Sequence, residues 1–191
     1  NRNFRDAKIK SKLVILCRKD VLNKLNDPNR SKYIQDSGIE LNWFQNSTDI
    51  KDNYLYKLIN LRAKTAFKTD IDVMKKFFPP TMYERETFRY LLDNTRYTPR
   101  DIIQIMNYIQ NVSYDGGATE STIKNGLNVY SDNYFLMEIK DSLVGMLPNN
   151  EIEEAFTAIT KIGLIEFNYM QFKKELPEDL NPLPILNALY V

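Results

Sequence analysis

The chain has 191 residues, of which 43% are hydrophobic and 27% are charged, a composition typical of one large or two small folded domains rather than of a disordered chain. It contains no histidine, which excludes His-based acid–base and nucleophilic catalysis and most zinc sites. It has no long apolar run and no signal-like N-terminus, so we expect a cytoplasmic protein.

Charge is unevenly distributed along the chain. Residues 1–32 contain ten Lys and Arg against three Asp and Glu, a net charge of +7, whereas residues 141–191 contain three Lys against eight Asp and Glu, a net charge of −5. Because nucleic-acid binding needs a basic surface, the acidic C-terminal part does not favour DNA binding. The basic N-terminal part could contact nucleic acid, but scattered surface lysines are the commoner meaning of such a pattern.

The segment KLVILC (12–17) predicts a strand buried on both faces, because it is short, continuously apolar and contains Val and Ile. Cys17, the only cysteine, is expected to be a buried reduced thiol. Arg18, Lys19 and Asp20 follow at the carboxyl end of this strand, which is the edge where α/β sheets bind ligands. Arg18 is therefore a candidate phosphate sensor, with an ion pair to Asp20 as the alternative.

Alternating apolar residues in SGIELNWF (37–44) predict a second short strand. Between the two strands, residues 20–25 are compatible with one or two helical turns, and residues 26–31 predict a loop because they contain Asn, Asp and Pro. Two strands do not form a stable sheet alone, so we expect neighbouring strands from outside this chain to complete it.

The remainder of the chain predicts helices, from apolar periodicity and from capping signals. SYDGGAT (113–119) is a Gly-centred break, and LIEF (164–167) is expected to be a short extended piece. The three helices of residues 151–191 resemble the helical part of a winged helix, without its wing. The predicted helices lie at residues 48–66, 70–80, 84–94, 99–110, 120–145, 151–162, 170–176 and 185–190.

The helix start TPRD (98–101) carries the sharpest local signal. Thr98 is a good N-cap, Pro99 occupies the first helical position, and Asp101 is placed to return its carboxylate to the cap N–H. Arg100 takes no part in this capping, so its side chain is expected to point outward. There it could meet a phosphate together with the helix N-terminus, or it could be a solvated or locally paired cation.

Arg62, near the end of the predicted helix 48–66, is a second candidate cation. It could act as an arginine finger across a subunit boundary, although a cation near a helix C-terminus commonly serves only the helix dipole. The sequence has no Walker A motif, no strand ending in two acidic residues and no calcium loop. It therefore contains no identifiable catalytic site or metal site, and whether it is part of an enzyme stays open.

The order of several motifs is similar to that in the C-terminal half of a family of bacterial P-loop ATPases, related to STAND and AAA-like ATPases and including phage-defence-like members. That family shows R-P-D after a core strand, an L-x-W strand, and a helix start of the form T-x-x-R-P-R-D. Here the Pro of the first motif is Lys19. The segments that carry the resemblance are VILCRKDVL (14–22), ELNW (40–43), LINLRAKT (58–65), FRYLLDNTRYTPRDIIQIMN (88–107) and YSDNYFLMEIKDSLVGM (130–146).

The resemblance implies a mainly α fold with a small α/β part. Residues 1–69 would be the C-terminal part of an ATPase α/β core, residues 70–115 a helical lid, and residues 116–191 a linker helix with a winged-helix-like domain. Arg100 would sense nucleotide phosphate from the lid, with Asp101 bracing the helix.

The resemblance also implies a function, that of an ATP-dependent regulatory switch. The chain would not hydrolyse ATP alone, and ATP with Mg²⁺ would bind only in a complete protein. Its partners would be the missing N-terminal ATPase half or further copies of the chain, and a protein docking on residues 141–191. The alternative is a non-enzymatic helical module that binds nucleic acid or protein.

Overall fold

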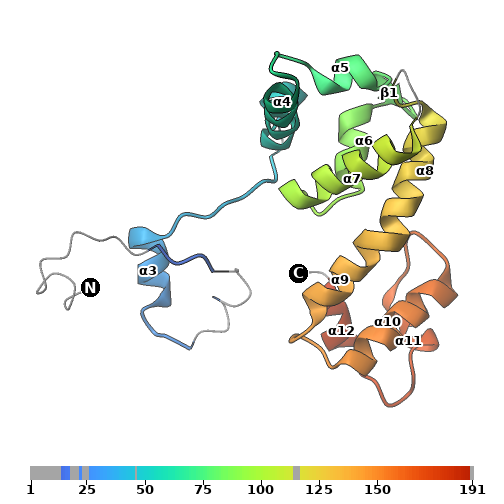
Figure 1. Cartoon of the computed structure of the whole chain (residues 1–191). Coiled ribbons are helices and arrows are strands. Elements are labelled where there is room, and N and C mark those ends of the chain that lie inside the picture. The colour runs from blue at the N-terminus through green and yellow to red at the C-terminus, as the bar shows by residue number, and fades with distance from the viewer. Residues whose placement is uncertain (1–13, 18–21, 23–25, 46, 114–116, 190–191) are drawn as a thin grey trace, which may run out of the picture. The chain divides into compact units, whose positions relative to one another are not determined.

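The computed structural model describes residues 14–17, 22, 26–45, 47–113 and 117–189 (Figure 1). The chain divides into two compact units, residues 1–42 and residues 43–191. The described residues are mainly helical, and the sheet they contain is one antiparallel pair of two-residue strands. The mainly α character of the predicted fold is confirmed, and the sheet lies at residues 81–86 rather than in the predicted α/β part. None of the described helices is long and apolar enough to cross a membrane.

In the N-terminal unit, the structure contains a helix that the sequence did not predict, α3 (Arg30–Ser37). Asp27 starts it, since its carboxylate accepts a hydrogen bond from the backbone N–H of Asn29 at 2.8 Å and its carbonyl accepts one from Arg30. No residue of α3 is buried. Without an apolar face there was no periodicity from which to predict this helix.

The predicted strands at residues 12–17 and 37–44 are not found in the described part of these segments. Residues 14–17 and 38–44 form no regular structure, and Val14, Ile15 and Ile39 are 78%, 76% and 88% exposed. Cys17 is also exposed, so the prediction of a buried thiol was wrong. The physical reason is that a strand needs a neighbour to satisfy its backbone groups, and apolar composition alone does not supply one. The helical turns expected at residues 20–25 fall almost wholly outside the described residues.

The C-terminal unit, residues 43–191, contains the helices that the sequence predicted. The expected long helix at 120–145 is built from two α-helices joined by a π-helical turn, while LIEF (164–167) is irregular rather than extended. The elements are η1 (Ile50–Asp52), α4 (Tyr54–Phe67), α5 (Val73–Phe77), β1 (Thr81–Met82), β2 (Arg85–Glu86), α6 (Thr87–Asp93), α7 (Pro99–Val112), α8 (Glu120–Tyr130), the π-helix η2 (Ser131–Phe135), α9 (Leu136–Leu143), α10 (Asn149–Ile162), α11 (Tyr169–Glu175) and α12 (Pro182–Leu189).

The small hairpin β1–β2 was missed because its turn lacks the usual residues. Tyr83 and Glu84 connect the strands and both have positive φ, 50° and 60°. Two central residues with positive φ are typical of the hairpin turns that match strand twist, and Asn and Gly are the residues expected there. The hairpin is held in place at its end, where the Thr87 hydroxyl donates to the carbonyl of Pro79 at 2.6 Å.

A first hydrophobic core joins α4 to the helices that follow it. Most of its members come from α4, α6, α7 and α8, with one each from η1, α5 and β1, and Trp43 packs against it from the segment before η1. The predicted boundary at residue 69 between ATPase core and lid therefore lies within one continuous core. Fully buried members are Leu55, Phe88, Leu91, Ile102, Ile105, Ile109, Ile123 and Tyr130.

A second hydrophobic core gathers the last three helices, as expected for residues 151–191. Phe172 of α11 and Ile185 of α12 are fully buried against Ala155 of α10. Gly163 ends α10 in the left-handed conformation, with φ of 62°, as the sequence predicted. The helix α8–η2–α9 runs from the first core to the second, in which Leu143 is buried (Figure 1).

We predict that Gly126→Ala destabilises the C-terminal unit. An added Cβ at Gly126 of α8 would lie 2.7 Å from the Cα of Ile109, so α7 and α8 would have to move apart. Ala is favoured over Gly in a helix by about 1 kcal/mol, but overpacking costs about 1–3 kcal/mol, so we expect a net loss of up to about 2 kcal/mol in urea unfolding. The exposed neighbour Asn125→Ala is the matched control and should leave stability unchanged or slightly higher. Stabilisation by Gly126→Ala would contradict close packing of the two helices.

Candidate functional site

The N-terminus of α7 is capped as the sequence predicted. The Thr98 hydroxyl oxygen accepts a hydrogen bond from the backbone N–H of Asp101 at 3.1 Å, and Pro99 occupies the first helical position. Arg100 follows with a side chain that is 72% exposed, in agreement with the expectation that it points outward. The exposed guanidinium therefore lies beside a well-formed helix start.

The Asp101 carboxylate is fully buried and does not return to the cap N–H. It accepts three hydrogen bonds from Arg96, from the backbone N–H at 3.0 Å, from Nε at 2.9 Å and from Nη2 at 2.7 Å. The hydroxyl of Tyr134, on η2, donates a further bond at 3.3 Å. The structure differs from the capping prediction for Asp101. Tyr97, with φ of 54°, turns the chain so that Arg96, and not the cap N–H, contacts the carboxylate.

Glu138 of α9 extends this network to Arg100. Its carboxylate lies 3.1 Å from Arg96 Nη2 and 3.6 Å from Arg100 Nη1. Two arginines from the α7 start thus share one carboxylate on the helix that leads into the second core. The contact to Arg100 is the longer and more exposed of the two, so it is the weaker.

The network shifts the pKa values of its members. Hydrogen bonding to Asp101 raises the pKa of Arg96 above its usual range, despite partial burial. Burial alone would raise the pKa of the Asp101 carboxyl, but the hydrogen bonds and charge of Arg96 outweigh it and lower that pKa. Burial raises the pKa of Tyr134 to about 12, and the Asp101 charge adds to this effect. At neutral pH Arg96 and Asp101 therefore form a charged pair, and Tyr134 is neutral.

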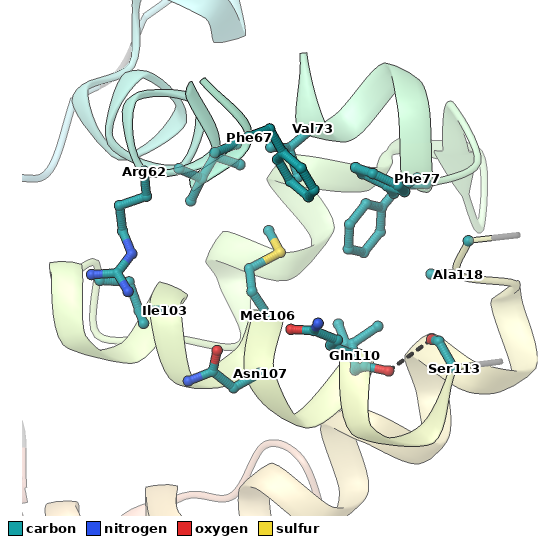
Figure 2. A pocket seen from close by; sticks show the side chains of 15 residues that line it. Arg62, Phe67, Val73, Phe77, Ile103, Met106, Asn107, Gln110, Ser113 and Ala118 are labelled. Atoms are coloured by element: carbon teal, nitrogen blue, oxygen red, sulfur yellow. Dashed lines mark hydrogen bonds between the residues drawn. The ribbon is translucent and has the colours of Figure 1, made fainter. Parts of the chain in front are cut away.

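Arg62, the second candidate cation, lies at the edge of a cavity of about 590 Å³ between α4, α5 and α7 (Figure 2). Its side chain lies near Ile103, which is one helical turn beyond Arg100 on α7 (Figure 2). Phe67 and Phe77 line the opposite part of the cavity. Arg18 is outside the described residues, so the structure does not place it.

Sequence reasoning missed both the cavity and Arg96. The cavity is formed by residues from three helices that are distant in the sequence, and no local pattern joins them. Arg96 sits before the cap in a segment without periodicity, although its position five residues before a buried acidic residue could have indicated it. No group of three or more Cys, Asp or Glu close enough to hold a metal ion occurs among the residues that the structure describes.

We predict that Asp101→Asn lowers the stability of the C-terminal unit by about 3 kcal/mol, because it removes the buried charge partner of Arg96 and leaves only the more exposed Glu138 carboxylate. In a protein of this size, that loss corresponds to a decrease in Tm of roughly 6–12 °C. Asp132→Asn, an exposed acidic residue on η2, is the control and should change Tm by much less. Equal effects of the two substitutions would show that the pair contributes no more than surface charge.

The pH dependence of this effect has a defined sign. Because the folded pKa of Asp101 is lowered, its contribution is fully present above about pH 4 and is lost as the pH falls through the folded pKa. The difference in Tm between the wild type and Asp101→Asn should therefore be constant between pH 7 and pH 5 and shrink below pH about 4. A difference that grew on acidification would contradict the assignment of a charged, paired Asp101.

Residues 53–137 match the family model of the FunZ-associated C-terminal helical domain. The matched stretch begins at the N-cap of α4, contains all buried members of the first hydrophobic core except Ile50, contains the Arg96–Asp101 pair, and ends one residue before Glu138. It covers less than half of the chain. No curated protein and no solved structure matches the chain. The comparisons thus show similarity to a helical C-terminal module over the part of the chain that carries the candidate site.

Proposed function

We propose that the chain is the C-terminal coupling part of an ATP-dependent regulatory switch, related to P-loop ATPases of the STAND and AAA-like type. In this proposal Arg100 senses a nucleotide phosphate presented by an ATPase core, and α9 passes the response to the helical domain of residues 149–189. ATP and Mg²⁺ bind in the complete protein. The chain alone does not hydrolyse ATP.

The observation that carries the proposal is the sharing of Glu138 by Arg96 and Arg100. Arg96 is fixed by the buried Asp101, whereas Arg100 is exposed and only loosely paired. An arginine in this position is available to a phosphate, which offers charge-assisted and bidentate hydrogen bonds stronger than a 3.6 Å contact. A phosphate on Arg100 therefore competes directly with a carboxylate of α9.

The π-helical turn η2 supplies an element that could take two states. Tyr134 ties η2 to Asp101, and Glu138 lies one turn further along the same helix. A π-helical turn holds one extra residue, so its conversion to α-helix would rotate α9 by about 100° relative to α8. A ligand shifts such an equilibrium only by binding the two states differently, and competition for Glu138 provides that difference.

Two further features support a coupling role. The family whose model matches residues 53–137 is described as a FunZ-associated C-terminal helical domain, a description compatible with a coupling module. The continuous helix α8–η2–α9 connects two separate cores, the geometry needed to transmit a movement.

The acidic residues 141–191 suit docking of a protein partner better than binding of DNA. We extend the proposal to that docking role and, with the resemblance, to regulation of the phage-defence type.

We predict that Arg100→Ala weakens ATP binding by the intact protein about tenfold or more, the loss expected for one charge-assisted hydrogen bond. Arg100→Lys should retain part of the affinity, because it keeps the charge but loses the bidentate geometry. Lys124→Ala, an exposed cation on α8, is the matched control and should bind ATP as the wild type does. Unchanged ATP affinity and turnover in Arg100→Ala would refute the sensor role. Calorimetric titration and steady-state hydrolysis measure the two quantities.

Glu138→Gln separates sensing from coupling. Removing the competing charge should leave the affinity for ATP equal or tighter, because phosphate no longer has to displace a carboxylate from Arg100. The effect of bound ATP on turnover should weaken, because α9 no longer loses an ion pair when phosphate binds. A Glu138→Gln protein that couples normally would exclude this carboxylate as the link.

A further inference from the structure

We propose that the cavity between α4, α5 and α7 binds a flat heteroaromatic anion of the purine nucleoside monophosphate class. This site is separate from the Arg100 network and does not depend on an ATPase core. The cavity volume, about 590 Å³, falls within the usual range of small-molecule sites, about 300–1,000 Å³. Its lining combines three kinds of group that together define the ligand chemistry.

The first group is a pair of aromatic rings. Phe67 at the end of α4 and Phe77 at the end of α5 lie with ring centroids 6.4 Å apart and an angle of 28° between their planes. Both line the cavity, with Met106 of α7 across from them (Figure 2). Phe67 is 57% exposed, so its ring is accessible to a ligand. Flat aromatic ligands stack on such rings with little dependence on their substituents.

The second group is a pair of amides on α7. Asn107 and Gln110 lie one turn apart, both line the cavity, and both are exposed. No hydrogen bond between described residues uses either side-chain amide, whereas the neighbouring Ser113 hydroxyl is already committed to the carbonyl of Ile109 at 2.7 Å. The two amides can therefore donate to and accept from a ligand. This requirement favours a heteroaromatic ring over an acyl chain, which would cover the amides and leave them unpaired.

The third group is the Arg62 guanidinium at the mouth of the cavity (Figure 2). Among the described residues it has no carboxylate within salt-bridge distance, unlike Lys57 and Lys64 on the same helix, which pair with Asp52 and Asp70. Lys76 adds a second positive charge 5.3 Å from the centre of the Phe77 ring. An arginine at one side of the cavity, unpaired among the described residues, and aromatic rings at the other match the phosphate and the base of a nucleotide, and Arg is the side chain best suited to a phosphate.

One backbone contact fixes the far end of the site. The N–H of Ala118 donates to the carbonyl of Phe77 at 2.6 Å, and Gly117 has φ of 116°. A Cβ on Gly117 would lie 2.8 Å from the Phe77 carbonyl oxygen, so only glycine fits. The backbone of Phe77 is therefore tied to the segment that leads into α8, which fixes the position of the end of α5.

The test is calorimetric titration of the chain with AMP, adenosine, ribose 5-phosphate and decanoate. We expect saturable binding of AMP, about tenfold weaker binding of adenosine, and little binding of the other two. Arg62→Ala should reduce AMP binding to the level of adenosine and leave adenosine binding unchanged. The matched controls are Lys57→Ala on the same helix and Lys124→Ala on α8, and both should bind AMP as the wild type does.

A second variant keeps the test decisive if Arg62 contributes only long-range charge. The double substitution of Asn107→Leu and Gln110→Leu lies on an exposed face, so it should fold, and it should weaken AMP and adenosine alike by about tenfold. Absence of saturable binding of both AMP and adenosine would overturn the proposal. Tighter binding of decanoate than of AMP, or AMP binding that neither variant weakens, would also overturn it.

Discussion

The buried pair of Arg96 and Asp101 is the interaction on which the C-terminal unit depends. It closes the turn before α7, because one carboxylate takes both the backbone N–H and the guanidinium of the residue five positions earlier. Through Tyr134 and Glu138 the same pair holds the helix α8–η2–α9 against the start of α7. A buried charge pair stabilises little in itself, but breaking it is costly, so it fixes one arrangement of the helices and disfavours others.

That rigidity places Arg100 in a defined but adaptable position. Its neighbours Thr98, Pro99 and Asp101 are fully engaged in capping and in the ion pair, while Arg100 projects into solvent with a single long contact. The proposed sensor thus combines a fixed backbone with a side chain that can exchange partners. Pre-organisation of this kind lowers the entropic cost of binding, because the helix start does not have to order when the phosphate arrives.

The sequence predicted the helices well and the strands poorly, for one physical reason. The periodicity of Ile102, Ile105 and Ile109 indicates a buried face wherever the partner helix comes from, and the cap at Thr98 is a local interaction. A strand such as the one expected at KLVILC (12–17) depends on hydrogen bonds to a neighbour, and apolar composition does not reveal whether that neighbour exists. The hairpin at Tyr83 and Glu84 was missed for the opposite reason, since its strand pairing overrides unfavourable turn residues.

By itself the sequence determined which segments become helical, where α7 starts and where Gly163 ends α10, because capping, proline geometry and apolar spacing act within a few residues. It also indicated that Arg100, unlike its neighbours at the helix start, takes no part in capping. Only the tertiary structure decided that Asp101 accepts hydrogen bonds from Arg96 and that Glu138 pairs with both Arg96 and Arg100. It also decided that Arg62, Phe67 and Phe77 line one cavity. Tertiary packing brings these side chains together. No local sequence pattern encodes which partner from another part of the chain a side chain will contact.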